Sequence, residues 1–216
     1  MKIEGYQVIH VDEKFVVVTG RPNVGKSSII REVMGVDVVI GKRPGTTKRV
    51  SQYPLSDGLI LVDMPGFGKM MGMSKRFGEK VNKKIVGFLE SNAQSIALAV
   101  HVLDISTFLE ISQRLEKKGF ISVDVEMAQF LAKILGEYPI VVANKIDKVN
   151  QNDLEDSLKA FTHEVHSGDP QTYLKQVYLV SAKTKEGIGA LKDAIHKRLV
   201  EKGYKTPFKA YRITKK

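Results

Sequence analysis

This chain of 216 residues contains no cysteine and no tryptophan, and aromatic residues make up only 7% of it. The absence of cysteine excludes disulfide bonds and thiol chemistry, although it says nothing about the redox compartment. No hydrophobic run approaches the length of a membrane span, and the first five residues lack the apolar core of a signal peptide. We therefore expect a cytoplasmic protein that does not enter a membrane.

Acidic residues are missing from segment 202–216, which carries six lysines and arginines. These six account for more than half of the net charge of +10. A basic excess favours a polyanionic partner such as nucleic acid, whereas a solvated tail that keeps the protein soluble explains the charge equally well. The remaining composition, 43% hydrophobic and 27% charged, is typical of one globular domain with a full core.

Apolar runs alternate with helical patterns along the chain, as in a parallel sheet with crossover helices. The patterns predict strands at 14–19, 48–54, 58–63, 96–103, 139–143 and 177–181, and helices near 25–34, 73–91, 123–136, 151–165 and 186–202. A turn at Asp57-Gly58 would pair the second and third strands as a hairpin. The expected fold is therefore α/β, with a mostly parallel six-stranded sheet, one antiparallel edge strand and helices on both faces. Segment 104–122 is expected to be an irregular connection.

A glycine-rich segment, Gly20-Arg21-Pro22-Asn23-Val24-Gly25-Lys26-Ser27, lies between the first predicted strand and the first predicted helix. Gly-x-x-x-x-Gly-Lys-Ser in that setting is typical of a phosphate-binding loop (P-loop). Its backbone N–H groups and the helix N-terminus attract phosphate oxygens. We expect Lys26 to reach the β- and γ-phosphates of a nucleoside triphosphate and the Ser27 hydroxyl to bind Mg²⁺.

Two further segments carry candidate magnesium ligands. Asp63 ends an apolar strand and Gly66 follows it, so the carboxylate can serve the Mg²⁺ shell and the glycine N–H can bond the γ-phosphate. Between the first helix and the next strand lies Gly45-Thr46-Thr47, where a threonine hydroxyl can complete the Mg²⁺ shell while the γ-phosphate is present and let go after hydrolysis. The adjacent threonines leave the ligand ambiguous, and we favour Thr47.

The base specificity is indicated by Asn144-Lys145-Ile146-Asp147, directly after an apolar strand. A carboxylate at Asp147 can accept hydrogen bonds from N1–H and the 2-amino group of guanine, whereas adenine offers neither donor. The stem of Lys145 can lie over the purine. Ser181-Ala182-Lys183 follows the last strand, where the Ala182 N–H could donate to guanine O6.

Taken in order, these motifs resemble the translation-factor class of small GTPases and its Era-like branch in particular. Val62-Asp63-Met64-Pro65-Gly66-Phe67-Gly68 looks like a switch segment of the EngB (YihA/YsxC) family, and residues 124–131 are similar to that family's helix before the guanine-motif strand. The resemblance covers about 14–200. It implies a doubly wound G domain at 14–201, Mg²⁺ as cofactor, GTP hydrolysis and a role in large ribosomal subunit assembly.

The resemblance leaves residues 1–13 as an N-terminal extension and 202–216 as a basic, aromatic C-terminal tail. Two departures from the family's pattern stand out. The base motif begins with Asn144 where EngB proteins usually have threonine, and the tail is more basic and aromatic than in bacterial members. An archaeal-type member would fit both departures.

Phe67 follows Gly66 at the position where Ras-like proteins carry the glutamine that orients the attacking water. Its ring has no group for that role, so hydrolysis needs help from elsewhere. Relatives with asparagine at the position of Asn23 use it to bind K⁺, and the resemblance implies the same here. A residue donated by a partner is one alternative, and an Asn23 that only caps the loop is another. A nucleotide-controlled RNA- or protein-binding module with negligible hydrolysis is the alternative function.

The predicted protein is a monomeric switch that binds GTP or GDP and the large ribosomal subunit or its RNA. The residues expected to act in catalysis are Asn23, Lys26, Thr47 and Gly66. The metal ligands expected are Ser27, Thr47 and Asp63 for Mg²⁺ and Asn23 for K⁺. The nucleotide contacts expected are Gly20, Arg21, Pro22, Asn23, Val24, Gly25, Lys26, Ser27, Ser28, Gly45, Thr46, Thr47, Asp63, Gly66, Asn144, Lys145, Asp147, Ser181, Ala182 and Lys183.

Overall fold

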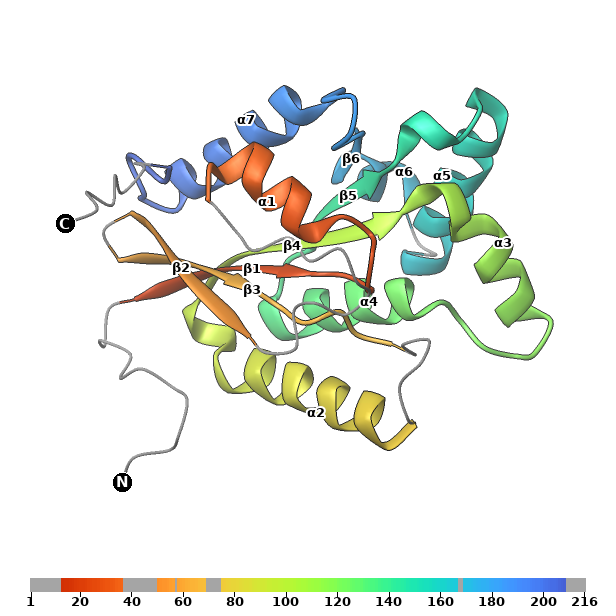
Figure 1. Cartoon of the computed structure of the whole chain (residues 1–216), viewed down its shortest axis with the longest axis horizontal. Helices are drawn as coiled ribbons and strands as arrows, with labels where there is room; N and C mark the ends of the chain where they lie inside the picture. Colours follow the sequence, from red (N-terminus) through yellow and green to blue (C-terminus); the bar gives the residue numbers. More distant parts are fainter. Residues whose placement is uncertain (1–12, 37–49, 57, 69–74, 167–168, 209–216) are drawn as a thin grey trace.

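The computed structural model describes residues 13–36, 50–56, 58–68, 75–166 and 169–208. A six-stranded sheet runs through the molecule in the order β2-β3-β1-β4-β5-β6 (Figure 1). Neighbouring strands are parallel except for β2, which pairs antiparallel with β3 at the edge. The strands are β1 (Lys14–Thr19), β2 (Ser51–Ser56), β3 (Leu59–Asp63), β4 (Ile96–Asp104), β5 (Ile140–Asn144) and β6 (Val177–Val180). This sheet confirms the predicted fold class.

Helices cover both faces of the sheet (Figure 1). They are α1 (Lys26–Met34), α2 (Lys75–Ser91), α3 (Ile105–Glu116), α4 (Val123–Leu135), α5 (Gln151–Val165), α6 (Pro170–Leu174) and α7 (Ile188–Glu201). Short 3₁₀ turns lie at Ala93–Ser95 and Ile146–Lys148. No helix within the described ranges has the length and apolar character needed to cross a membrane.

The alternation of side chains along β1 divides the core into two layers. Val16 and Val18 pack with residues of α1 and α7 on one face of the sheet. Phe15 and Val17 pack with residues of α2 and α4 on the other face. Because both faces of the sheet are covered at β1, the strand is apolar along nearly its whole length, as is usual for parallel strands.

Segment 104–122, predicted as an irregular connection, instead contains helix α3. Asp104 caps its N-terminus by accepting a hydrogen bond from the Ser106 N–H. Ile105 and Phe108 are buried one turn apart. The helical spacing of apolar residues was therefore present in the sequence, but it extends over too few residues to predict a helix. The short helix α6 was also not predicted. The other element boundaries differ from the predicted ones by up to three residues.

The parallel strands bring their carboxyl ends to one edge of the sheet, where the predicted motifs meet. The P-loop follows β1, Asp63 ends β3, Asn144 ends β5 and Ser181 follows β6. In an open α/β sheet this edge, at the point where the strand order reverses beside β1, is where ligands bind.

Candidate functional site

The P-loop connects β1 to α1 and buries the ammonium group of Lys26. Lys26 is 7% exposed, and its Nζ donates to the carbonyl oxygens of Gly20 at 2.9 Å and Arg21 at 3.0 Å. No side chain caps the N-terminus of α1, which begins directly after Gly25. The N–H groups of the first turn therefore face the same place as the lysine, an arrangement that suits a phosphate group.

Asp63 places a carboxylate beside this cation. The side chain is 2% exposed, and its Oδ1 has no hydrogen-bond partner in the described part of the chain. Burial raises the pKa of Asp63 to about 6, although Lys26 opposes the shift. Burial likewise lowers the pKa of Lys26 to about 8, against the attraction of Asp63 and Asp124. An orphaned carboxylate oxygen at this edge fits a hard, oxygen-seeking cation such as Mg²⁺.

The base motif and the P-loop are joined by the side chain of Asn144. Its Nδ2 donates to the Val24 carbonyl at 2.7 Å, and its Oδ1 accepts from the Ala182 N–H at 3.0 Å. The residue is 2% exposed, so both bonds are shielded from water. Asn144 therefore holds three loops together. The Ala182 N–H, predicted to meet guanine O6, is bonded here to Asn144.

Asp147 is oriented by the loop after β6. Its Oδ1 accepts a hydrogen bond from the Ser181 hydroxyl at 2.7 Å, and Lys183 lies 3.9 Å from its Oδ2. The hydrogen bond from Ser181 lowers the pKa of Asp147 below its usual value, with smaller contributions from nearby cations. The carboxylate is thus kept ionised and ready to accept hydrogen bonds, as guanine recognition requires.

Lys145 lies between Asn144 and Asp147 with a positive φ of 72°. Its Nζ forms an ion pair with Asp104, the residue that ends β4 and caps α3. The pair fixes the end of the lysine side chain. The sequence analysis did not connect Asp104 with the base motif.

The segment after β3 returns to the P-loop. A Cβ atom on Gly66 would lie 2.7 Å from both the Cγ and the backbone N of Pro22, so only glycine fits this close approach. The ring of Phe67 is 2% exposed and stacks on His101 of β4, with centroids 5.8 Å apart. Phe67 is therefore a core residue here and presents no polar group to the site.

A buried charge network that the sequence analysis missed supports the P-loop from α4. Arg21 Nε lies 2.9 Å from Asp124 Oδ2, and Asp124 is 1% exposed. The other carboxylate oxygen lies 3.6 Å from His101 Nε2, whose ring also contacts the Thr19 hydroxyl through Nδ1 at 3.0 Å. These residues are far apart in the chain, and only their arrangement in the fold connects them.

Part of the predicted site lies outside the described residues, namely Gly45, Thr46 and Thr47. Within the described part, Ser27 and Ser28 follow Lys26 in the first turn of α1. Asn23 is exposed with a positive φ of 65°, and its side chain makes no hydrogen bond to another described residue. A purely capping role for Asn23 therefore finds no support in the described contacts.

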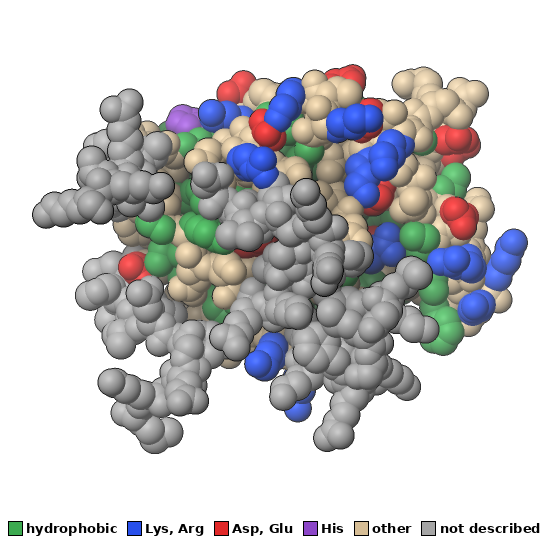
Figure 2. All heavy atoms as spheres, in the orientation of Figure 1, with side chains coloured by type: hydrophobic (Ala, Val, Ile, Leu, Met, Phe, Trp, Pro, Cys, Tyr) green, Lys and Arg blue, Asp and Glu red, His purple; other side chains and the backbone are tan. Residues whose placement is uncertain are grey.

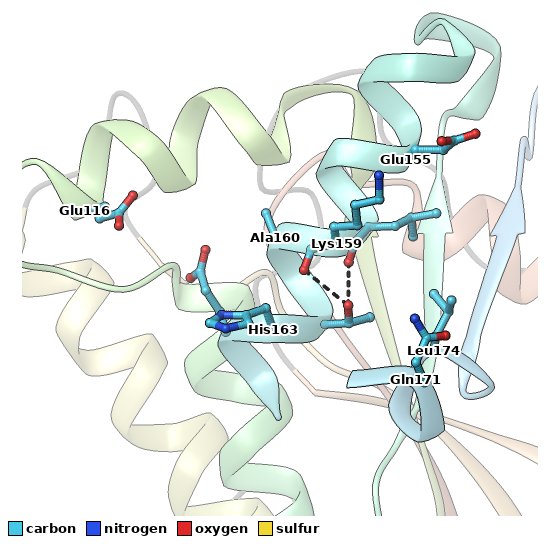
Figure 3. Close-up of a pocket in the computed structure, with 10 residues that line it drawn as sticks. Glu116, Glu155, Lys159, Ala160, His163, Gln171 and Leu174 are labelled. Atoms are coloured by element: carbon cyan, nitrogen blue, oxygen red, sulfur yellow. Dashed lines mark hydrogen bonds between the residues drawn. The ribbon is translucent and has the colours of Figure 1, made fainter. Parts of the chain in front are cut away.

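A hollow of about 630 Å³ lies away from this edge, between α3, α5 and α6 (Figure 3). Glu116, Glu155 and His163 are among the residues that line it, and none of the predicted site residues does. The Thr162 hydroxyl in its wall donates to the Leu158 and Lys159 carbonyls of its own helix.

Comparison with known proteins identifies the family. The sequence model of a family described as 50S ribosome-binding GTPase matches residues 15–145. The chain is 41% identical over 192 residues to the probable GTP-binding protein EngB of Methanopyrus kandleri, covering 88% of this chain and 94% of that protein. It is 36% identical over 200 residues to the EngB protein of Archaeoglobus fulgidus, covering 92% and 98%.

Solved structures agree with the sequence comparisons. A crystal structure of a probable GTP-binding protein EngB superposes with a TM-score of 0.76 at 36% identity, covering 87% of this chain and 99% of that chain. Aquifex aeolicus Era, at 22% identity and a TM-score of 0.56, shares the fold. The chain belongs to the EngB family of GTP-binding proteins, which hydrolyse GTP.

Proposed function

We propose that this GTPase acts as a molecular switch in the assembly of the large ribosomal subunit. The proposal is carried by the match to a family described as 50S ribosome-binding GTPase over residues 15–145. The net charge of +10 supports it, because ribosomal RNA is a polyanion. A switch of this kind holds its phosphate-contacting segments in one arrangement while GTP is bound and releases them after hydrolysis.

Different residues of the site would hold different parts of the nucleotide. Lys26 would exchange its two backbone carbonyl partners for phosphate oxygens, and the N–H groups at the start of α1 would bond the same phosphates. Ser27, Thr47 and Asp63 would hold Mg²⁺, which neutralises phosphate charge when it is bound. Gly66 would donate its N–H to the γ-phosphate, and Asp147 would select guanine.

We also propose that Asn23 binds K⁺ beside the phosphates. Its side chain is exposed and forms no hydrogen bond to another described residue, which supports this role. The burial of Phe67 also supports it, because the water that attacks the γ-phosphate then lacks its usual orienting residue. Hydrolysis should then be slow and clearly faster in KCl than in NaCl at equal ionic strength. Asn23→Ala should remove the difference between the salts while GDP affinity stays within a few-fold. Equal rates in the two salts for the natural protein would contradict the potassium role.

Co-sedimentation with purified large ribosomal subunits tests the switch. Binding should be strong with a non-hydrolysable GTP analogue and weak with GDP. Binding that ignores the nucleotide, or no binding at all, would contradict the assembly role. Single-turnover hydrolysis with and without the subunits separates a switch from the alternative, a binding module with negligible hydrolysis, because only a switch must turn GTP over.

A further inference from the structure

The loop between α3 and α4, residues Lys117–Ser122, presents the two most exposed large hydrophobic side chains in the described part of the molecule. Phe120 is 64% exposed and Ile121 is 47% exposed. Scattered exposed leucines or valines are ordinary, but an adjacent aromatic and aliphatic pair at a loop tip is the kind of patch that marks a contact surface.

The backbone of this loop is fixed. The Gly119 N–H donates to the Glu116 carbonyl at 2.8 Å and the Phe120 N–H donates to the Leu115 carbonyl at 3.0 Å. With Gly119 at a φ of 73°, these bonds form a Schellman motif at the end of α3. In that motif the side chain at the position of Phe120 often packs back on the helix. Here it faces water, so a rigid backbone holds an aromatic ring outward.

Three cations lie close to Phe120 in the chain. Arg114, Lys117 and Lys118 are exposed and form no ion pair within the described ranges. Figure 2 shows blue and green side chains next to each other at the edge of the molecule that α3 occupies in Figure 1. The one acid in this turn, Glu116, lines the hollow of Figure 3. The loop therefore offers positive charge together with one outward-facing aromatic ring.

We propose that the α3–α4 loop binds unpaired RNA, with Phe120 stacked on a base and Arg114, Lys117 and Lys118 on the neighbouring phosphates. This inference rests on the proposed function, because it names the surface that would meet ribosomal RNA. Aromatic stacking combined with cations that follow the backbone is the common mode of single-strand recognition. The excess positive charge of the whole chain favours RNA over an acidic peptide of equal size.

The loop is continuous with the nucleotide site. Ser122 caps α4, and Asp124 in its first turn pairs with Arg21 of the P-loop. Val123 lies beside Gly68, where an added Cβ would be 3.9 Å from Val123 Cγ1. An RNA held at Phe120 would thus lie only a few residues from contacts with the P-loop and with the segment after β3.

The chain contains no tryptophan, so Phe120→Trp introduces a single indole at the proposed contact. Titration with a single-stranded RNA of about ten nucleotides should quench its fluorescence, because a base stacks on the ring. A second single-tryptophan variant, Val200→Trp, should be quenched much less, since Val200 is 41% exposed but lies on α7, away from α3 (Figure 1). A blue shift with anionic lipid vesicles, without quenching by RNA, would overturn the proposal in favour of a membrane contact.

Substitutions at Phe120 distinguish stacking from burial in an apolar groove. Phe120→Ala and Phe120→Leu should each weaken RNA binding about tenfold, whereas Phe120→Tyr should restore it. If Phe120→Leu bound as tightly as the natural protein, the proposal would be overturned, because a groove accepts leucine and a base does not stack on it. Lys117→Gln with Lys118→Gln should weaken binding more than the charge-matched control, Lys133→Gln with Lys175→Gln.

The same variants separate this inference from the switch proposal. If the natural protein co-sediments with ribosomal subunits and Phe120→Ala does so equally well, the loop proposal is wrong and the switch proposal stands. If RNA quenches Phe120→Trp but the natural protein does not bind subunits, the loop proposal stands and the assembly role fails. Thermal unfolding of each variant should match the natural protein, because the exposed ring contributes little to the core.

Discussion

The nucleotide site contains two buried groups whose charges are penalised by burial. Asp63 and Lys26 are each less than a tenth exposed, and burial moves the pKa of both toward neutrality, to about 6 and about 8. A phosphate beside Lys26 and a cation beside Asp63 would each stabilise the charged form. The charges of a bound phosphate and a bound cation would therefore compensate Lys26 and Asp63 for the hydration that burial removes.

This arrangement predicts a bell-shaped pH dependence of Mg²⁺·GDP binding. Below about pH 6 Asp63 takes up a proton and loses its attraction for the metal, and above about pH 8 Lys26 loses its proton and its attraction for phosphate. Affinity measured with a fluorescent GDP analogue should therefore be highest between these values. Asp63→Asn, or measurement in EDTA, should abolish the acid limb attributed to Asp63 and leave the alkaline limb. An unchanged acid limb in Asp63→Asn would assign that limb to another group, such as the phosphate itself.

Guanine selection is predicted to depend on one carboxylate. Asp147 accepts a hydrogen bond from Ser181 and has oxygen lone pairs left for the base. Asp147→Asn should lower GDP affinity by at least about a hundredfold, because an amide N–H faces the donors of guanine. The same variant should gain affinity for xanthosine diphosphate, which carries a carbonyl where guanine carries its amino group. Competition binding with the two nucleotides measures both changes, and parallel losses for both would show a folding defect.

At the scale of the elements, the loops at the carboxyl edge depend on contacts with one another. The end of β5 is tied to the P-loop and to the loop after β6 by Asn144, and α4 is tied to the P-loop by Asp124. The parallel sheet sets the loops side by side, but side-chain bonds fix their separation. The two ends of the nucleotide site should therefore respond together to a change in either contact.

Removal of the Asn144 side chain tests this dependence. Asn144→Ala leaves the Val24 carbonyl and the Ala182 N–H without their partners, which should lower the free energy of unfolding by about 1–3 kcal/mol. GDP affinity should fall as well, because both loops are proposed to contact the nucleotide. Asn150→Ala is a matched control: Asn150 caps the exposed start of α5, so its loss should cost about 1 kcal/mol without changing GDP affinity. Urea unfolding and GDP titration of the two variants give the comparison.

At the scale of the whole molecule, the positive charge of the C-terminal tail is not all available to a partner. Lys202 donates to the Ala97 carbonyl and pairs with Glu137, and the rings of Tyr204 and Phe208 pack against the core. These two rings therefore contribute to the core of the domain. Tyr211 and the last four basic residues lie outside the described range.

Deletion of residues 209–216 should separate the two roles of the tail. It removes four cations and no acid. It leaves Lys202 and Phe208 in place, so the melting temperature should stay within about 2 °C, since surface changes away from the core have small effects. RNA affinity should fall, and its dependence on salt should become shallower, because fewer counterions are released. A longer deletion from 202 should also destabilise the fold. Equal RNA affinity for the natural protein and the 209–216 deletion would favour the solvated-tail interpretation.

The sequence by itself determined the fold class, and it predicted the phosphate loop and the base-specifying carboxylate, because each depends on residues close together in the chain. Gly20 to Ser27 are consecutive residues between β1 and the first turn of α1, and Asp147 lies three residues after the end of a strand. Tertiary structure alone decided how distant residues meet. Asn144 joins Val24 to Ala182, Asp124 holds Arg21, and Phe67 stacks on His101. Such contacts depend on the order of the strands in the sheet and on which side chains are buried, and neither can be predicted from the spacing of neighbouring residues in the sequence.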